Sequence, residues 1–229
     1  NNDGRKEIIA FNYGDFHDET GIRENASQIF AFESGGSLLW SINIPTNLQV
    51  SMLMADLNND GNKEIVIKSN NAWERKIMII NQFGEIISIW DTFEKSWGGS
   101  IEGSLAIGNF DEDDDFEIVM ADPSENAGGI FDGDNLIGFN NEGVIYIYNM
   151  DGSIVDGWPR YTEGIIFSSP VVGDIDNDGK DDIVVGLQYA SDIFPEENLG
   201  GLYAFDKNGN ILPGWPYKQG YNFWSTPAL

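Results

Sequence analysis

An acidic motif that recurs four times along the 229 residues constrains the fold more than any other feature of the sequence. It reads "NNDGRKEIIA" at the start, then "ADLNNDGNKEIVI", "GNFDEDDDFEIVM" and "GDIDNDGKDDIVVG". The equivalent aspartates are Asp3, Asp60, Asp113 and Asp178, so successive copies lie 57, 53 and 65 residues apart. A period of this length is typical of propellers and solenoids, in which each repeat is one supersecondary unit.

Within a repeat, short apolar runs alternate with turn residues and lack helical spacing. The fourth repeat reads "FSSPVVGDI", the acidic loop, "DDIVVGLQY", "GGLYAFDK", an Asn-Gly turn and "NILPGWPYK". The third has "SLAIGNF", "FEIVMADP", "GVIYIYNM", an Asp-Gly turn and "SIVDGWP". Asn-Gly and Asp-Gly between apolar runs are strong hairpin signals. The sequence therefore predicts an all-β fold, a β-propeller built from four-stranded antiparallel blades.

The repeats divide the chain into one FG-GAP-like propeller domain, or part of one, over residues 1–229. We expect units at about 1–46, 47–97, 98–162 and 163–222. The C-terminal "FWSTPAL" matches "FSSPVV", so residues 223–229 are the first strand of a further or composite blade. A closed four-blade ring and a slice of a larger propeller both fit, and we expect the sequence to begin inside a longer protein.

Each copy of the motif places oxygen-bearing residues at alternate positions of a loop. Counted from Asp174, carboxylates stand at positions one, three, five and nine, and position seven offers a backbone carbonyl. Oxygen ligands without nitrogen or sulfur suit a hard cation, calcium before magnesium. We expect about one Ca²⁺ per repeat. The ligands are Asp174, Asp176, Asp178, Lys180 and Asp182 in the fourth repeat, and Asp56, Asn58, Asp60, Asn62 and Glu64 in the second.

The third and first copies depart from this pattern. The third has Asp114 where position six is otherwise glycine, and we expect the site to be retained because aspartate tolerates left-handed backbone. The first copy lacks its first ligand, so its site is incomplete. The expected ligands are Asn109, Asp111, Asp113, Asp115 and Glu117 in the third repeat, and Asn1, Asp3, Arg5 and Glu7 in the first.

Three other interpretations of the acidic loops are weaker. An EF-hand needs a glutamate at position twelve, where this chain has Ile67, Met120 and Val185. Acid–base catalysis needs one site, whereas these acids recur in every repeat. A solvated acidic turn does not explain why oxygen-bearing residues return at the same positions.

Composition excludes several classes of partner. Thirty-eight acidic against twelve basic residues give a net charge of −26, which disfavours nucleic acid and anionic membranes. The chain has no cysteine, so disulfides and thiolate zinc sites are absent. No apolar run approaches the roughly 18 residues that span a bilayer, so we expect no direct membrane insertion in this segment.

Tryptophans fall into two groups. One recurs in the fourth strand of every repeat and is expected to pack between blades: Trp40, Trp90, Trp158 and Trp215. Other aromatics lie off this register, several of them in the long insertions after each second strand. We expect a ligand-binding role for Trp73, Trp97, Phe131, Phe194 and Trp224, the alternative being that they cover blade edges.

The order "SPVVGDIDNDGKDDIVVG" followed by "GGLYAF" resembles FG-GAP repeats, the units of integrin α-subunit propellers and of VCBS-type microbial surface proteins. "IVMADPSENAGG" before "GVIYIY" is similar to the Gly-Ala-Pro element of that family. "FSSP" and "FWSTP" replace its Phe-Gly element, which favours the broader microbial class over integrins. The resemblance implies calcium in the hairpin between strands one and two, and recognition on the opposite face.

We therefore expect a calcium-stabilised extracellular, secreted or cell-surface propeller that serves recognition or adhesion. It would bind a protein or glycan and not be an enzyme. Cytosolic calcium is too low to fill such sites, which is why we expect an extracellular location. One alternative is a domain of a carbohydrate-active enzyme, either a polysaccharide lyase or a lectin-like protein. Another is a structural module that stacks against neighbouring domains or subunits of a surface assembly.

Overall fold

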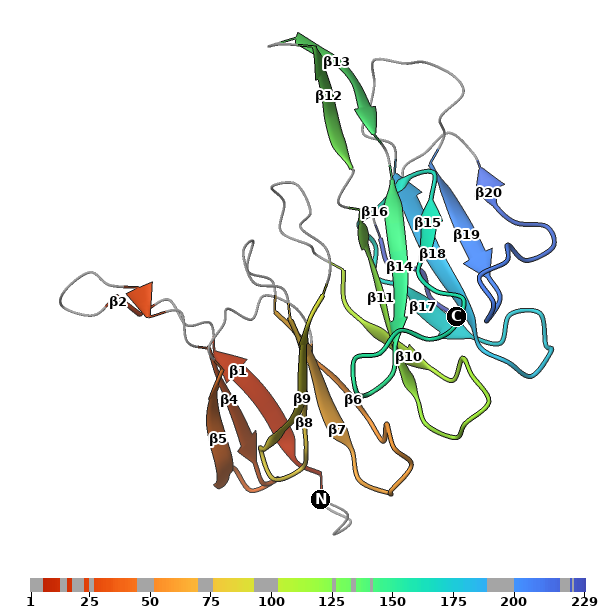
Figure 1. Ribbon diagram of the computed structural model, residues 1–229. Helices are drawn as coiled ribbons and strands as arrows, with labels where there is room; N and C mark the ends of the chain where they lie inside the picture. The colour runs from red at the N-terminus through yellow and green to blue at the C-terminus, as the bar shows by residue number, and fades with distance from the viewer. Residues whose placement is uncertain are drawn as a thin grey trace. The chain divides into compact units, whose positions relative to one another are not determined.

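The structure is a computed structural model that divides into two compact units, Asn1–Phe93 and Glu94–Leu229 (Figure 1). It describes residues 6–12, 16–17, 23–24, 27–44, 52–69, 76–92, 103–124, 127–132, 135–140, 142–188, 200–218, 223 and 225–229. These residues form β-strands and turns and no helix, and the paired strands are antiparallel. The prediction of an all-β fold with antiparallel sheets is confirmed.

The first unit holds two main sheets. One has three strands in the order β1 (Ile8–Asn12), β4 (Ser27–Phe32) and β5 (Leu38–Ile44). The other has four, β6 (Leu53–Ala55), β7 (Glu64–Lys68), β8 (Lys76–Ile80) and β9 (Ile86–Asp91). A two-stranded pair, β2 (Phe16–His17) and β3 (Arg23–Glu24), lies in the insertion between β1 and β4.

The second unit also holds two main sheets. The first is ordered β10 (Ala106–Gly108), β11 (Glu117–Pro123), β14 (Gly143–Tyr148) and β15 (Arg160–Thr162). In the second, β18 (Asp182–Gln188) pairs along one edge with both β16 (Ile165–Ile166) and β17 (Val171–Gly173). Its other edge pairs with β19 (Gly201–Phe205), which is followed by β20 (Tyr217–Lys218).

The second and third strands of the repeats form the buried middle of each complete sheet. Every residue of β7, β11, β14 and β18 is buried, as expected of continuous apolar runs with protein on both faces. The outer strands β5 and β9 carry mostly exposed residues. The β6–β7–β8–β9 sheet thus runs from buried middle strands to a mostly exposed outer strand.

The fourth strands of the third and fourth repeats are shorter than the sequence suggested. After the hairpin turn they make single bridges, Tyr148 to Ile154 and Phe205 to Ile211, before a further turn breaks them. A Trp-Pro pair follows in both repeats, and proline has no N–H to donate to a ladder. Pairing resumes only in the short strands β15 and β20.

The insertion after β11 contains a hairpin that the apolar pattern of the sequence did not predict. Strands β12 (Gly128–Asp132) and β13 (Asn135–Asn140) pair with a bulge between Ile130 and Phe131. The hairpin projects from the end of the β10–β11–β14–β15 sheet that lies opposite the acidic loop (Figure 1). The Asp-Gly turn signal in "IFDGDN" marked it in the sequence.

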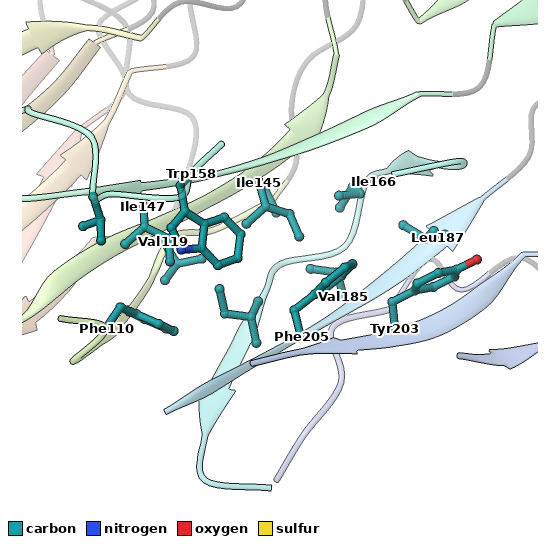
Figure 2. Packing of buried hydrophobic residues seen from close by; sticks show 13 residues of the cluster. Phe110, Val119, Ile145, Ile147, Trp158, Ile166, Val185, Leu187, Tyr203 and Phe205 are labelled. Atoms are coloured by element: carbon teal, nitrogen blue, oxygen red, sulfur yellow. The ribbon is translucent and has the colours of Figure 1, made fainter. Parts of the chain in front are cut away.

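A shared core joins the two sheets of the second unit. Phe110, Val119, Ile147 and Trp158 pack together with residues of β18 and β19 (Figure 2). The first strands lie side by side, and the Ser104 amide donates to the Ser169 hydroxyl at 2.8 Å. At the outer end, Trp158 Nε1 donates to the Lys207 carbonyl at 3.1 Å.

The first unit repeats this sheet-to-sheet contact. Trp40 Nε1 donates to the Gln82 carbonyl at 3.0 Å, and Gly84 of the same turn lies against the Trp40 ring. Gln82 and Lys207 hold equivalent places in their hairpin turns. The predicted inter-sheet packing is confirmed for Trp40 and Trp158.

The described parts of the chain contain no helix of the length and apolarity needed to cross a membrane.

Candidate metal sites

Three described acidic loops connect the first and second strands of their sheets. They join β6 to β7, β10 to β11 and β17 to β18. In each hairpin the residue before loop position one pairs with the acid at position nine: Ala55 with Glu64, Gly108 with Glu117, and Gly173 with Asp182. Position nine is therefore the first residue of the second strand. Strand pairing at this residue holds its carboxylate next to the start of the loop.

These position-nine carboxylates are buried. Glu64, Glu117 and Asp182 are 2%, 1% and 2% exposed. One oxygen of each accepts a hydrogen bond from the backbone N–H of loop position two, with distances of 3.0 Å from Leu57, 2.6 Å from Phe110 and 2.8 Å from Ile175. The same side-chain-to-loop contact therefore occurs in all three described loops.

Burial raises the pKa of these three carboxyl groups. For Glu117 the pKa rises from 4.5 to about 7, chiefly through burial, with the nearby Asp111, Asp113 and Asp115 adding to the rise. Burial is also the main cause of the raised pKa of Glu64 and of Asp182, again beside other loop acids. An acid held in this setting is stabilised in its charged form by a cation.

At position one, the second and fourth loops share one hydrogen-bond pattern. Asp56 accepts the N–H groups of Asp60 and Gly61 at 3.0 and 2.8 Å. Asp174 accepts those of Asp178 and Gly179, both at 3.0 Å. Positions four and six of these two loops have left-handed backbone: Asn59, Gly61, Asn177 and Gly179, with φ of 53°, 88°, 63° and 85°.

The carboxylate at position five turns the chain toward position seven in each loop. Asp60, Asp113 and Asp178 accept the N–H two residues later at 2.7, 2.9 and 2.8 Å. Each of the three residues at position three accepts the N–H of position five, at 3.1, 2.9 and 3.1 Å for Asn58, Asp111 and Asp176. The side chains at positions one, three and five are thereby gathered on the loop interior.

The third loop differs at positions one and six. Asp114 does not adopt the left-handed backbone that we expected of it. Asn109 carries an amide where the other loops have a carboxylate. Its Nδ2 donates to the carbonyls of Asp113 and Asp115 at 2.8 and 3.2 Å. The Asp115 carbonyl, predicted as a ligand, is thus bonded within the loop.

Carboxylate oxygens converge in two of the loops. One oxygen from each of Asp111, Asp113 and Glu117 lies within 4.8 Å of the others, and the same holds for Asp174, Asp176 and Asp182. These donors are hard oxygen atoms, and one member of each group is a buried acid with a raised pKa. Both observations fit a hard divalent cation.

Several predicted site residues lie outside the described residues. They are Asn1, Asp3 and Arg5 of the first loop and the aromatics Trp73, Trp97, Phe194 and Trp224. Glu7 is described and partly buried. Phe131 belongs to β12, where only the backbone is described.

Sequence reasoning missed the residues that link the third and fourth loops. Asp181 accepts the backbone N–H of Asn109 at 2.9 Å, and Lys207 pairs with Glu112 at 2.6 Å. Asp181 stands beside Asp182, a predicted ligand. The sequence alone does not show that Asp181 contacts the neighbouring loop and is not itself a ligand. Both loops line a polar hollow of about 360 Å³.

Comparison with protein families gives one match, in the fourth repeat. Residues 167–205 match the family model described as the FG-GAP repeat, which runs from Phe167 through the fourth acidic loop to the end of β19. The chain thus carries an FG-GAP repeat where the acidic loop and its hairpin are most regular. A comparison with curated proteins found no match.

Proposed function

We propose that the chain is a calcium-stabilised β-propeller module of the FG-GAP type, close to the VCBS-type repeats of microbial surface and secreted proteins. Its loops bind calcium for stability, and the opposite ends of its sheets bind a protein or glycan. The module acts outside the cytoplasm, in recognition or adhesion. It performs no chemistry of its own.

The repeated burial of the position-nine acid carries the calcium proposal. A carboxylate that is 1–2% exposed and lies beside other acids is costly in its ionised form without a compensating charge. A solvated acidic turn has no reason to bury such a group three times. Calcium, when bound, supplies that charge and draws the loop oxygens together.

The loops differ in how many carboxylates they offer to calcium and at which positions. In the fourth loop Asp174, Asp176, Asp178 and Asp182 offer carboxylates, and Lys180 a carbonyl. The second loop offers Asp56, Asn58, Asp60 and Glu64 with the Asn62 carbonyl. The third offers Asp111, Asp113 and Glu117, with Asn109 turned to bond its own loop. We expect the third site to be the weakest of these three because it lacks a carboxylate at position one.

The propeller arrangement is supported by the sheet architecture and by the sheet-to-sheet contacts. Three of the four main sheets have at least four antiparallel strands, and tryptophan-to-turn bonds join the sheets within each unit. Such contacts between successive blades are what a propeller requires. The proposal includes two arrangements of the blades: a closed ring of four, or part of a larger propeller.

Recognition at the ends away from the acidic loops is supported by where the insertions lie. In antiparallel sheets, connections after the second strand leave from the end opposite the first hairpin. The β12–β13 hairpin lies there in the second unit (Figure 1). Long insertions on a rigid scaffold are common binding elements.

Two experiments test the proposal. A calorimetric titration should show calcium binding with dissociation constants of about 0.1–1 mM, as in extracellular modules. A glycan array probed with and without chelator should then show calcium-dependent binding that is lost when residues 127–141 are replaced by a short turn. Absence of calcium binding contradicts the metal proposal. Glycan binding that survives this replacement contradicts the assignment of recognition to the hairpin.

A further inference from the structure

One hydrogen bond joins the third acidic loop to the fourth. The Asp181 carboxylate accepts the backbone N–H of Asn109 at 2.9 Å. Asn109 opens the third loop, and Asp181 stands at position eight of the fourth, between the expected ligands Lys180 and Asp182. Both loops belong to the second unit and line the same polar hollow. A residue that is not among the expected ligands of one loop therefore holds the backbone of the other.

The Asp181 carboxylate fits closely against the strand that precedes the third loop. A Cβ added at Gly108 would lie 2.9 Å from Asp181 Oδ2 and 2.5 Å from Val172 Cγ1. Position eight is Lys63 in the second loop and Phe116 in the third, and neither side chain offers an oxygen acceptor. Among the described loops, the fourth is therefore the one that can make this bond.

An ion pair links the same parts of the unit more weakly. Lys207, in the turn after β19, pairs with Glu112 of the third loop at 2.6 Å. The Glu112 side chain is 82% exposed, and exposed ion pairs contribute little because water and salt screen them. The bond from Asn109 to Asp181 is partly buried, and its donor is fixed to the backbone. This bond is therefore the stronger link between the two loops.

The freedom of Asp181 depends on its two neighbours. Lys180 offers a carbonyl and Asp182 a carboxylate to the fourth site, so filling that site fixes the chain on both sides of Asp181. An acceptor that is already ordered costs less to use when the neighbouring loop becomes ordered in turn. Such a saving gives positive coupling between two sites without a large structural change.

Charge acts in the opposite direction. A cation in one loop offsets negative charge that also attracts a second cation to the other loop. Salt at about 0.15 M screens interactions between exposed charges beyond about 8 Å, whereas a hydrogen bond persists. Measurements at this salt concentration therefore report mainly the contribution of Asp181.

We propose that Asp181 couples the two loops, so that calcium in the fourth loop strengthens calcium binding in the third. Asp181 is a positioning residue, because it holds the Asn109 N–H and with it the start of the third loop. The inference rests on the proposed calcium role of the loops and adds an order of binding, the fourth loop before the third. By linkage, calcium in the third loop strengthens binding in the fourth by the same factor.

Hydrogen exchange at two neighbouring amides tests the proposal. The Asn109 N–H bonds to Asp181 of the fourth loop, whereas the Phe110 N–H bonds to Glu117 of its own loop. The measurement uses the full chain with Asp113→Ala, which removes a ligand of the third loop, in about 0.15 M salt. Calcium should slow exchange at Asn109 about threefold and leave Phe110 unchanged.

Two substitutions at Asp181 separate positioning from a general effect on folding. Asp181→Asn keeps an oxygen acceptor and should retain the calcium effect on Asn109, whereas Asp181→Ala should abolish it. In the chain with an intact third loop, Asp176→Ala in the fourth loop should weaken calcium binding at the third about threefold. The same change should add no further weakening when Asp181 is already alanine, because the link is then absent.

The outcomes distinguish this inference from the proposed function. A chain with Asp113→Ala that binds no calcium in a calorimetric titration contradicts both the calcium role and the coupling. If that chain binds calcium but exchange at Asn109 stays the same, the coupling alone is wrong. Equal slowing at Asn109 and Phe110 also overturns it, because calcium would then stabilise the whole unit without acting through Asp181.

Discussion

The indole Nε1 of Trp158 donates a hydrogen bond to the carbonyl oxygen of Lys207 at 3.1 Å, from one sheet of the second unit to the hairpin turn of the next. Arg160 adds a bond from Nη2 to the Asn208 carbonyl of the same turn at 2.8 Å. The Trp40–Gln82 bond repeats the relationship in the first unit. In the first and third repeats, a tryptophan after the hairpin turn therefore bonds to the turn of the neighbouring sheet.

Replacing Trp158 should destabilise the second unit. Its ring is 7% exposed within the core that contains Phe110, so Trp158→Ala should lower the free energy of unfolding by about 3–5 kcal/mol. Trp158→Phe keeps most of the apolar contact and loses the N–H, and should cost less. Urea unfolding followed by circular dichroism measures both. A Trp158→Ala variant as stable as the parent chain would show that this contact does not hold the sheets together.

Glycine 84 allows a test of the contact between turn and tryptophan. Gly84 has φ of 82°, and a Cβ there would lie 2.8 Å from the Trp40 ring. Gly36 holds the equivalent turn position with φ of 86° and open space around it. Both alanine variants meet the left-handed backbone cost of about 1 kcal/mol, but only Gly84→Ala displaces the ring. We expect Gly84→Ala to have the lower melting temperature, and equal losses would contradict the contact.

Much of the fold could be predicted because the second and third strands are continuous apolar runs, and in the third and fourth repeats an Asp-Gly or Asn-Gly turn follows the third strand. The division of the fourth strands into two parts could not be predicted. The apolar residues suggest one continuous strand, but the proline after Trp158 and after Trp215 interrupts the pairing. The β12–β13 hairpin was missed despite its Asp-Gly signal, because the residues on either side do not alternate regularly between apolar and polar.

The convergence of the loop acids was predictable from spacing, since a nine-residue loop returns its last acid to the start of the next strand. Two features of the site were not. The burial of Glu117 depends on the neighbouring strands that cover it, and the bond from Asn109 to Asp181 joins loops that are 72 residues apart. The expectation of left-handed backbone at Asp114 was wrong. In this loop the Asn109 side chain donates to the carbonyls of Asp113 and Asp115, so the hydrogen bonds differ from those of the other two loops.

Stability without metal should fall as the pH rises through the titration of Glu117. Its folded pKa of about 7 exceeds the ordinary 4.5, so between these values the folded chain binds more protons than the unfolded chain. The metal-free protein should therefore be more stable near pH 5 than near pH 7.5, by on the order of 2–3 kcal/mol. Chemical unfolding in chelator measures this difference.

Two variants assign that pH dependence. Glu117→Gln should reduce the pH dependence, to which Glu64 and Asp182 also contribute, whereas the exposed Asp156→Asn in the same unit should leave it unchanged. A metal-free chain that gains stability from pH 5 to pH 7.5 would contradict the raised pKa of Glu117.

Asp181 should affect calcium binding at the third loop without being a ligand there. Asp181→Ala removes the acceptor of the Asn109 N–H, and loss of about 1 kcal/mol of hydrogen bonding should weaken that site roughly fivefold. Asp156→Ala is the control, an exposed acid away from the loops. Calorimetric titration resolves the two variants, and identical isotherms would show that the loops bind independently of this bond.

Thermal unfolding of the chelator-treated chain, with calcium added back, tests the calcium proposal most directly. We predict that the melting temperature rises with calcium and levels off in the low millimolar range, each filled site contributing about 1 kcal/mol. The rise should be smaller with magnesium, and smaller in the Asp174→Ala variant, which removes the position-one carboxylate of the fourth loop. A melting temperature that stays the same from chelator to about 10 mM calcium would contradict a structural metal role for the acidic loops.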